Sequence, residues 1–255
     1  MRLARIQGDD GPLAVAQRGD RWEVVRDLFA DDLEFTGESF PVGQVTFLPP
    51  VEPRLVLGMA HNSGPGDRKL PPQAFFKSPH TVVGEQEPIV IDAGIGPVSI
   101  EGEVALVIGR RCRHLTPGEA RAVVLGCTIA NDVTAVGQIP LDDRLLQAKG
   151  GDGFTPLGPW IETDVDPDDL AITVLVNDEV VAESSSKALA WSIDEQLVYL
   201  SSHLELGPGD VILTGSPRTA APVESGDSAE IRIDGLGSLR NPVGSGPARA
   251  PLPTP

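Results

Sequence analysis

Aromatic residues and cysteines are scarce in this sequence, and each scarcity limits the possible architecture. Aromatics make up 4% of the 255 residues, so we expect a core built mainly from Val, Leu, Ile and Ala. The only two cysteines, Cys112 and Cys127, lie beside apolar segments and lack the spacing of a metal-binding pair. We therefore expect two buried thiols rather than a disulfide.

Basic charge and long apolar runs are also lacking. The formal net charge of −17 argues against binding to nucleic acid or to anionic membrane surfaces, because both attract basic patches. No apolar run reaches the roughly 18 residues of a transmembrane helix, and the N-terminal residues lack the apolar core of a signal peptide. We expect a soluble cytoplasmic protein. An anionic substrate would require a metal ion or a specific lysine to reverse the negative field.

Glycine and proline, in contrast, are abundant. The 28 glycines and 24 prolines favour many short elements joined by tight turns, and the hydrophobic content of 40% is sufficient for a core. Strand-like pieces followed by Pro-Pro indicate a small N-terminal subdomain over residues 1–50. The main domain is expected over residues 51–243. Residues 244–255, rich in Pro, Gly and Ala, are expected to form a disordered tail.

Three local patterns in the main domain predict particular elements. Asn177-Asp178 between two apolar runs predicts a hairpin over residues 172–181. The apolar periodicity of residues 193–204 predicts an amphipathic helix. Thr116, followed by Pro and then by Glu at the third helical position, predicts a short helix that includes residues 120–124.

Two carboxylates stand one residue apart at the head of an apolar run, in Glu101-Gly102-Glu103. Residues i and i+2 of a strand face the same side, so Glu101 and Glu103 would point together. Their mutual repulsion and loss of hydration would be relieved by a hard divalent cation, which prefers carboxylate oxygens. Taken alone, the pair is also consistent with two solvated glutamates on an exposed strand edge.

Further polar residues follow at strand ends. Asp132 closes an apolar run about thirty residues later and offers a third carboxylate for the same cation. Lys149 lies in glycine-rich sequence, although lysine is rare in this acidic chain. Residues 211–215 are expected to form an apolar strand, and the segment continues to Pro217 with hydroxyl and backbone donors at its end.

Four segments, in this order, resemble the fumarylacetoacetate hydrolase family. Its signature consists of a Glu-x-Glu strand, an Asn-Asp strand end, a Lys before a Pro-Leu-Gly-Pro turn, and a Gly-Asp-Val-Ile-Leu-Thr-Gly-Thr-Pro segment. The matching positions here are Glu101 with Glu103, Asn131-Asp132, Lys149 before the turn at 156–159, and residues 209–217. Each motif alone is weak, but the ordered set covers residues 53–243.

The resemblance implies an α+β, mainly β fold: a mixed β-roll or β-sandwich with few short helices, forming a homodimer. It implies a Mg²⁺ or Mn²⁺ ion held by Glu101, Glu103 and Asp132, and a 2-oxo or 1,3-dicarbonyl acid as substrate. The cation would act as a Lewis acid on developing enolate charge, with Lys149 adding a second positive charge. Ser216, where the family usually has Thr, and Thr214 would contact the substrate.

The loop that carries the family's water-activating pair departs from the pattern. Hydrolases and decarboxylases of the family usually carry Gly-x-Asn-Tyr-x-x-His-x-x-Glu, in which His and Glu form a dyad. Here Gly58 begins a shorter loop, and neither way of aligning it gives a complete dyad. His61 is the best available acid/base, and Asp67 is the candidate to orient it. The alternative for His61 is a loop residue that bonds only to backbone.

The expected substrate shell is altered as well. The family commonly has Ala-Arg-Asp-x-Gln after the Asn-Asp strand end, whereas this chain has Ala135-Val136-Gly137-Gln138. The substrate-reading arginine is therefore missing, and Gln138 is a candidate substrate contact. We expect a pocket for a ligand that is less anionic, or bulkier, than a small dicarboxylate.

Three functions are compatible with these residues. The leading hypothesis is metal-dependent C–C bond hydrolysis of a 2-oxo or 1,3-dicarbonyl acid through an enolate. The second uses the same centre for decarboxylation, keto–enol tautomerisation or cyclisation of a larger substrate, which requires the cation but not the dyad. The third is a non-catalytic metal-binding protein, against which the retention of Lys149 counts.

Overall fold

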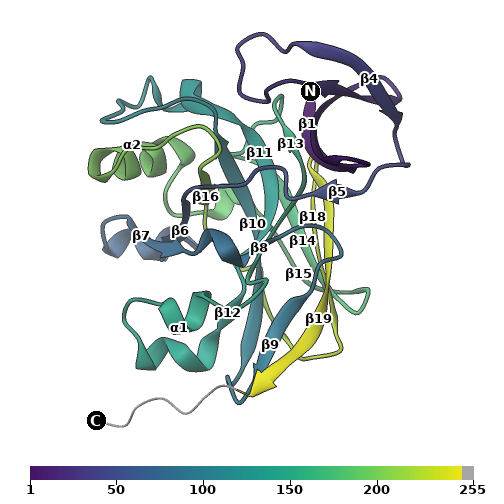
Figure 1. Ribbon diagram of the computed structural model, residues 1–255. Helices are drawn as coiled ribbons and strands as arrows, with labels where there is room; N and C mark the ends of the chain where they lie inside the picture. The colour runs from purple at the N-terminus through teal and green to yellow at the C-terminus, as the bar shows by residue number, and fades with distance from the viewer. Residues whose placement is uncertain (249–255) are drawn as a thin grey trace.

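The protein is described by a computed structural model that covers residues 1–248. Within this range the chain is mainly β, with two sheets and few helices, which confirms the predicted fold class. In Figure 1 the N-terminal strands lie at the upper right, whereas the longest helix lies on the opposite, left-hand side. None of the helices in residues 1–248 combines the length and apolar character needed to span a bilayer.

The larger sheet contains fourteen of the strands described. They are β1 (Arg2–Gly8), β2 (Gly11–Arg18), β3 (Arg21–Val25), β4 (Phe35–Pro41), β5 (Phe47–Leu48), β6 (Val56–Ala60), β7 (Gln73–Lys77), β8 (Val82–Val83), β10 (Val98–Ile108), β11 (Val124–Asn131), β12 (Thr134–Ala135), β13 (Thr155–Glu162), β16 (Val211–Leu213) and β17 (Ala220–Val223). The main path is β4-β3-β2-β1-β13-β11-β10-β16-β6-β7, so β10 lies inside the sheet and β7 at its edge.

The smaller sheet follows the order β15-β14-β18-β19-β9. Its strands are β9 (Ile89–Ala93), β14 (Ala171–Val176), β15 (Glu179–Ser185), β18 (Ser228–Ile233) and β19 (Gly237–Ala248). The predicted hairpin is confirmed as β14–β15, with Asn177 and Asp178 at φ 53° and 65° in its turn. Such left-handed backbone is the conformation that two-residue hairpin turns require.

Helical segments are short and lie outside the sheets. They are α1 (Leu146–Lys149) and α2 (Ile193–His203), with the 3₁₀ turns η1 (Pro65–Lys69), η2 (Pro79–Thr81), η3 (Ala120–Val123), η4 (Val136–Leu141) and η5 (Ser186–Ala188). The predicted helix over 193–204 is confirmed as α2, which begins with a reciprocal capping box between Ser192 and Glu195. The helix expected after Thr116 is only the 3₁₀ turn η3, because the chain enters strand β11 at Val124.

The N-terminal residues form an antiparallel meander that continues the larger sheet. Strand β1 pairs with β13 in the register Leu3–Ile161, so the meander is joined to the main body by backbone hydrogen bonds. Trp22 is buried in a small apolar cluster formed by β1, β2 and β3. The centroid of its ring lies 5.5 Å from that of Phe47 and 6.4 Å from that of Trp160. This cluster packs the meander against β13, whereas Leu3, Ala16, Val25 and Leu28 belong to an apolar cluster shared with the main body.

Two other expectations concern the cysteines and the C-terminal tail. Cys112 and Cys127 are both free and buried, as predicted. The tail expected from residue 244 begins too early, because β19 continues to Ala248 and pairs with β9. That pairing supplies backbone partners which composition does not reveal. Residues 249–255 lie outside the described part of the chain.

Strand β10 is buried on both faces and determines where its glutamates point. Val104 and Leu106 belong to one apolar cluster, whereas Ala105 and Val107 belong to another. Because side chains alternate along a strand, Glu103 shares the face of Ala105 and Val107. The apolar residues that follow Glu103 thus hold the strand in the core. Glu103 lies next to Ala105 on the same buried face of β10.

Candidate functional site

The register of two neighbouring strands brings three carboxylates together. In β10–β11, Gly102 pairs with Asn131, and the N–H of Asp132 donates to the carbonyl of Glu101 at 2.9 Å. Oxygen atoms of Glu101, Glu103 and Asp132 all lie within 4.8 Å of one another. The predicted side-by-side placement of the two glutamates is therefore present, and Asp132 joins them from the end of β11.

Lys149, the last residue of α1, binds two of these carboxylates. Its Nζ lies 2.6 Å from Asp132 Oδ2, 2.6 Å from Thr134 Oγ1 and 3.5 Å from Glu101 Oε2. Burial disfavours the ammonium, but the charges of Asp132 and Glu101 outweigh burial and raise the pKa of Lys149. Lys149 is therefore a fixed, protonated cation at the site.

A second lysine, Lys77 at the end of β7, is also part of the site and was missed in the sequence. Its fully buried ammonium pairs with Asp132 Oδ1 and donates to the carbonyl oxygen of Phe154 at 2.7 Å. Phe75 lies two residues earlier and thus on the same face of β7, with its ring centroid 4.9 Å from Lys149 Nζ. The sequence did contain a signal for Lys77, because the chain has only four lysines and this one directly follows the apolar residues 74–76.

The charges at the site leave Glu103 without a cationic partner. Lys77 and Lys149 pair with Asp132, and Lys149 also reaches Glu101. Glu103 is 2% exposed and accepts one hydrogen bond, from the Gly215 N–H at 2.7 Å. Burial, reinforced by the charges of Asp132 and Glu101, raises the pKa of Glu103 well above its usual range.

This donor set fits a divalent cation. Burial also raises the pKa of Glu101, whereas the two lysines outweigh burial and lower the pKa of Asp132. The three carboxyl groups outnumber the two lysines beside them, and Glu103 pairs with neither lysine. Hard divalent ions bind such oxygen clusters, so Glu101, Glu103 and Asp132 are suited to hold one.

The two residues of the predicted acid/base pair, His61 and Asp67, lie in the segment that follows β6. His61 follows β6, is exposed, and has left-handed backbone with φ 50°. Asp67, in η1, accepts hydrogen bonds from the Ser63 N–H and hydroxyl, both at 2.8 Å. These bonds lower the pKa of Asp67, and the charge of His61 contributes least to that shift. Asp67 therefore fastens the loop, and its role in orienting His61 stays a prediction.

The three predicted substrate-contacting residues all have partners within the protein. The Thr214 hydroxyl donates to the Val104 carbonyl at 2.8 Å. The Ser216 hydroxyl lies 2.8 Å from that of Thr219, and the Gln138 amide donates to the Ile95 carbonyl at 2.6 Å. Substrate contact by Thr214, Ser216 and Gln138 stays a prediction.

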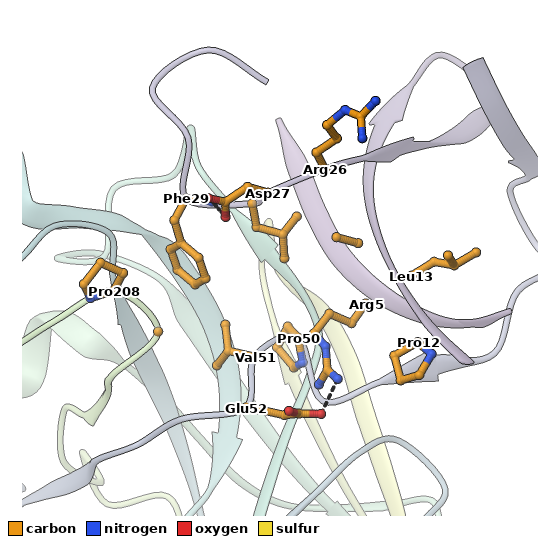
Figure 2. Close-up of a pocket in the computed structure, with 13 residues that line it drawn as sticks. Arg5, Pro12, Leu13, Arg26, Asp27, Phe29, Pro50, Val51, Glu52 and Pro208 are labelled. Atoms are coloured by element: carbon orange, nitrogen blue, oxygen red, sulfur yellow. Dashed lines mark hydrogen bonds and ion pairs between the residues drawn. The ribbon is translucent and has the colours of Figure 1, made fainter. Parts of the chain in front are cut away.

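A separate cavity of about 350 Å³ lies between the N-terminal meander and the main body. Figure 2 shows Pro50, Val51 and Glu52 along it, with Glu52 paired to Arg5 of β1. Its lining residues come from positions 5–29, 50–52 and 208–209, so the cavity is distinct from the carboxylate site.

Comparison with known proteins gives family matches along most of the chain. The family described as fumarylacetoacetate (FAA) hydrolase C-terminal matches residues 56–244, and the one described as Rv2993c-like, N-terminal matches residues 1–50. Protein Rv2993c of Mycobacterium tuberculosis is 36% identical over 259 residues, which cover 95% of this chain and 98% of that protein.

Solved structures agree with these matches. The structure of 5-carboxymethyl-2-hydroxymuconate delta-isomerase from Mycobacterium smegmatis is 37% identical with a TM-score of 0.91, covering 96% of this chain and 100% of that one. Maleylpyruvate hydrolase from Sphingobium sp. SYK-6, in complex with manganese(II) and pyruvate, is 27% identical with a TM-score of 0.80 over the same shares. Because the family model matches residues 56–244, which include the carboxylate cluster, the chain belongs to the fumarylacetoacetate hydrolase family.

Proposed function

We propose that this protein is a divalent-metal-dependent keto–enol isomerase or tautomerase. It would transfer a proton to and from the carbon next to the carbonyl of a 2-oxo acid. Decarboxylation of such an acid belongs to the same chemistry. The observation that carries the proposal is the buried cluster of Glu101, Glu103 and Asp132, with the Lys149 ammonium 2.6 Å from Asp132 Oδ2. The isomerase and the pyruvate complex among the similar structures support the reaction type and the substrate class.

The three carboxylates would hold a Mg²⁺ or Mn²⁺ ion. When bound, the ion supplies Lewis-acid stabilisation of negative charge that develops on the substrate oxygens. Lys149 adds a positive charge at the same place. Because Asp132 and Thr134 both bind its Nζ and Phe75 covers it, this ammonium is oriented before substrate arrives and loses little freedom on binding.

Proton movement requires an acid/base within reach of the carbon, and His61 is our candidate. Its loop is tied to the site through Asn62, whose side-chain amide donates to the Thr214 carbonyl at 2.7 Å. Isomerisation needs one group that takes a proton and returns it. Hydrolysis needs, in addition, a pair that activates water, and Asp67 binds Ser63 instead. We therefore place isomerisation first, with hydrolysis second because hydrolases are also among the similar structures.

Product analysis in D₂O tests the proposal. Purified protein is incubated with Mn²⁺ and either oxaloacetate or an acylpyruvate, and products are followed by NMR. We expect deuterium to enter the carbon next to the carbonyl, with loss of the effect in EDTA and in Lys149→Met. Lys187→Met is the matched control, because Lys187 is an exposed lysine paired with Asp169.

Other outcomes would decide against isomerisation. Cleavage into two acids would establish hydrolysis as the main reaction. Mn²⁺ binding without turnover of any of these acids would favour a metal-binding protein without this activity. The homodimer implied by the family resemblance stays a prediction, which sedimentation of the purified protein tests.

A further inference from the structure

Asn62 is a buried polar residue beside His61, and its side-chain amide makes hydrogen bonds on two sides. It is 2% exposed, although both of its neighbours, His61 and Ser63, are exposed. Its Nδ2 donates to the Thr214 carbonyl at 2.7 Å, and its Oδ1 accepts the Trp191 N–H at 2.7 Å. A single side chain therefore ties the loop after β6 to the end of β16 and to the start of α2.

The peptide group that Asn62 binds also holds a candidate metal ligand. The Thr214 carbonyl and the Gly215 N–H belong to the same planar peptide group and point in opposite directions. Asn62 binds the carbonyl edge, and Glu103 Oε2 accepts from the N–H edge at 2.7 Å. Rotation of this one peptide plane would change both contacts together.

Packing around Gly215 leaves this peptide little room to move. A Cβ at Gly215 would lie 2.5 Å from the Asn62 carbonyl oxygen and 2.8 Å from its Cβ, and the φ of 106° also favours glycine. The loop is held on its far side as well, because Arg68 pairs with Glu195 and stacks 4.5 Å above the Trp191 ring. Close packing at Gly215 on one side and the Arg68 contacts on the other thus restrict movement of Asn62 relative to the peptide plane.

From these contacts we infer that Asn62 is a positioning residue that couples the His61 loop to the metal ligand Glu103 through the 214–215 peptide. Glu103 has no lysine partner, so its orientation depends on the Gly215 N–H. Outer-shell partners that orient a ligand change metal affinity by about 10–100-fold when removed. Because such coupling is reciprocal, a cation bound by Glu103 also stabilises the loop. The inference rests on the metal centre of the proposed function.

The test compares Asn62→Asp with a matched control, Asn241→Asp. The aspartate at position 62 keeps an acceptor for the Trp191 N–H but loses the donor to the Thr214 carbonyl. Asn241 is 1% exposed and donates to the Gly84 and Glu87 carbonyls at 2.7 and 2.9 Å, so it is an equally buried bridging amide elsewhere in the fold. Mn²⁺ affinity is measured by the EPR signal of the free ion, together with the melting temperature.

We expect the Kd for Mn²⁺ to rise at least about tenfold in Asn62→Asp and to be unchanged in Asn241→Asp, although both melt earlier. Gly215→Ala disturbs the same peptide from its other side and should weaken Mn²⁺ binding similarly. If Asn62→Asp does not fold, the Mn²⁺ affinity of Gly215→Ala is compared with that of the wild type instead. In hydrogen exchange, Mn²⁺ should protect residues 63–70 in the wild type but not in Asn62→Asp.

Two results overturn the inference and leave the proposed function intact. One is an unchanged Mn²⁺ affinity in folded Asn62→Asp or Gly215→Ala, which would make Asn62 a purely structural bridge. The other is equal Mn²⁺-induced protection of the loop in the wild type and Asn62→Asp. Failure of the wild type itself to bind Mn²⁺ would instead refute the metal centre, and the inference with it.

Discussion

Replacement of Glu103 by glutamine should change stability in opposite directions with and without metal. The side chain is 2% exposed, and its one hydrogen bond comes from the Gly215 N–H. Glutamine has nearly the same shape, so its carbonyl oxygen can accept that bond while its NH₂ group faces the carboxylates of Glu101 and Asp132. The substitution therefore removes a buried, repelled charge and supplies donors to its neighbours.

The size of the effect follows from these contacts. Burying a carboxylate without a cationic partner costs at least about 1–3 kcal/mol, so we expect metal-free Glu103→Gln to be more stable by about that amount. For a protein of this size each kcal/mol corresponds to about 2–4 °C in melting temperature. Mn²⁺ at about a thousand times its Kd should stabilise the wild type by about 4 kcal/mol and the variant far less. The order of the two melting temperatures should therefore reverse.

The pH dependence has a definite sign. The pKa of Glu103 is raised in the folded protein, so its contribution to stability is full below its usual value of 4.5 and is lost as pH rises through the raised pKa. In EDTA the advantage of Glu103→Gln should thus be near zero in acid and grow with increasing pH.

Calorimetry in EDTA and in Mn²⁺, at several pH values, measures these differences. Glu230→Gln is the control, because Glu230 is similarly buried but paired with Arg232 and Arg240, so its loss should destabilise the protein in both conditions. If metal-free Glu103→Gln is less stable than the wild type at neutral pH, Glu103 stabilises the fold and the reasoning is refuted.

Three further substitutions separate chemistry from folding. Lys149→Met should lower turnover about 10²–10³-fold while Mn²⁺ still binds, because it removes a positive charge and no carboxylate ligand; normal turnover would exclude Lys149 from the reaction. His61→Ala should lower turnover about 10²–10⁴-fold without changing the melting temperature or Mn²⁺ affinity, since the side chain is exposed, and unchanged turnover would remove His61 from the mechanism. Lys77→Met breaks a fully buried ion pair with Asp132, so it should lower the free energy of unfolding in EDTA by about 3–5 kcal/mol. Urea titration measures this difference. A change below about 1 kcal/mol, the size expected for an exposed ion pair, would contradict the interpretation.

Local patterns predicted those parts of the fold that depend on neighbours in sequence. The Asn177-Asp178 turn and the helix α2 follow from turn chemistry and apolar periodicity, and both are present. The prediction failed where long-range pairing decided the outcome. Residues 244–248 have a tail-like composition but form a strand because β9 supplies their partners.

The sequence by itself indicated the candidate metal ligands, because two glutamates at i and i+2 in a strand must share a face, and the ordered motifs added Asp132 as a third ligand and Lys149 as a neighbouring cation. Only the tertiary structure decided what surrounds them. Lys77 reaches Asp132 across 55 positions, and Asn62 reaches the Thr214 carbonyl across 152. No spacing rule connects residues so far apart; the sheet register and the loop packing bring them together. Those contacts decide which carboxylate lacks a lysine partner, and they link the His61 loop to it.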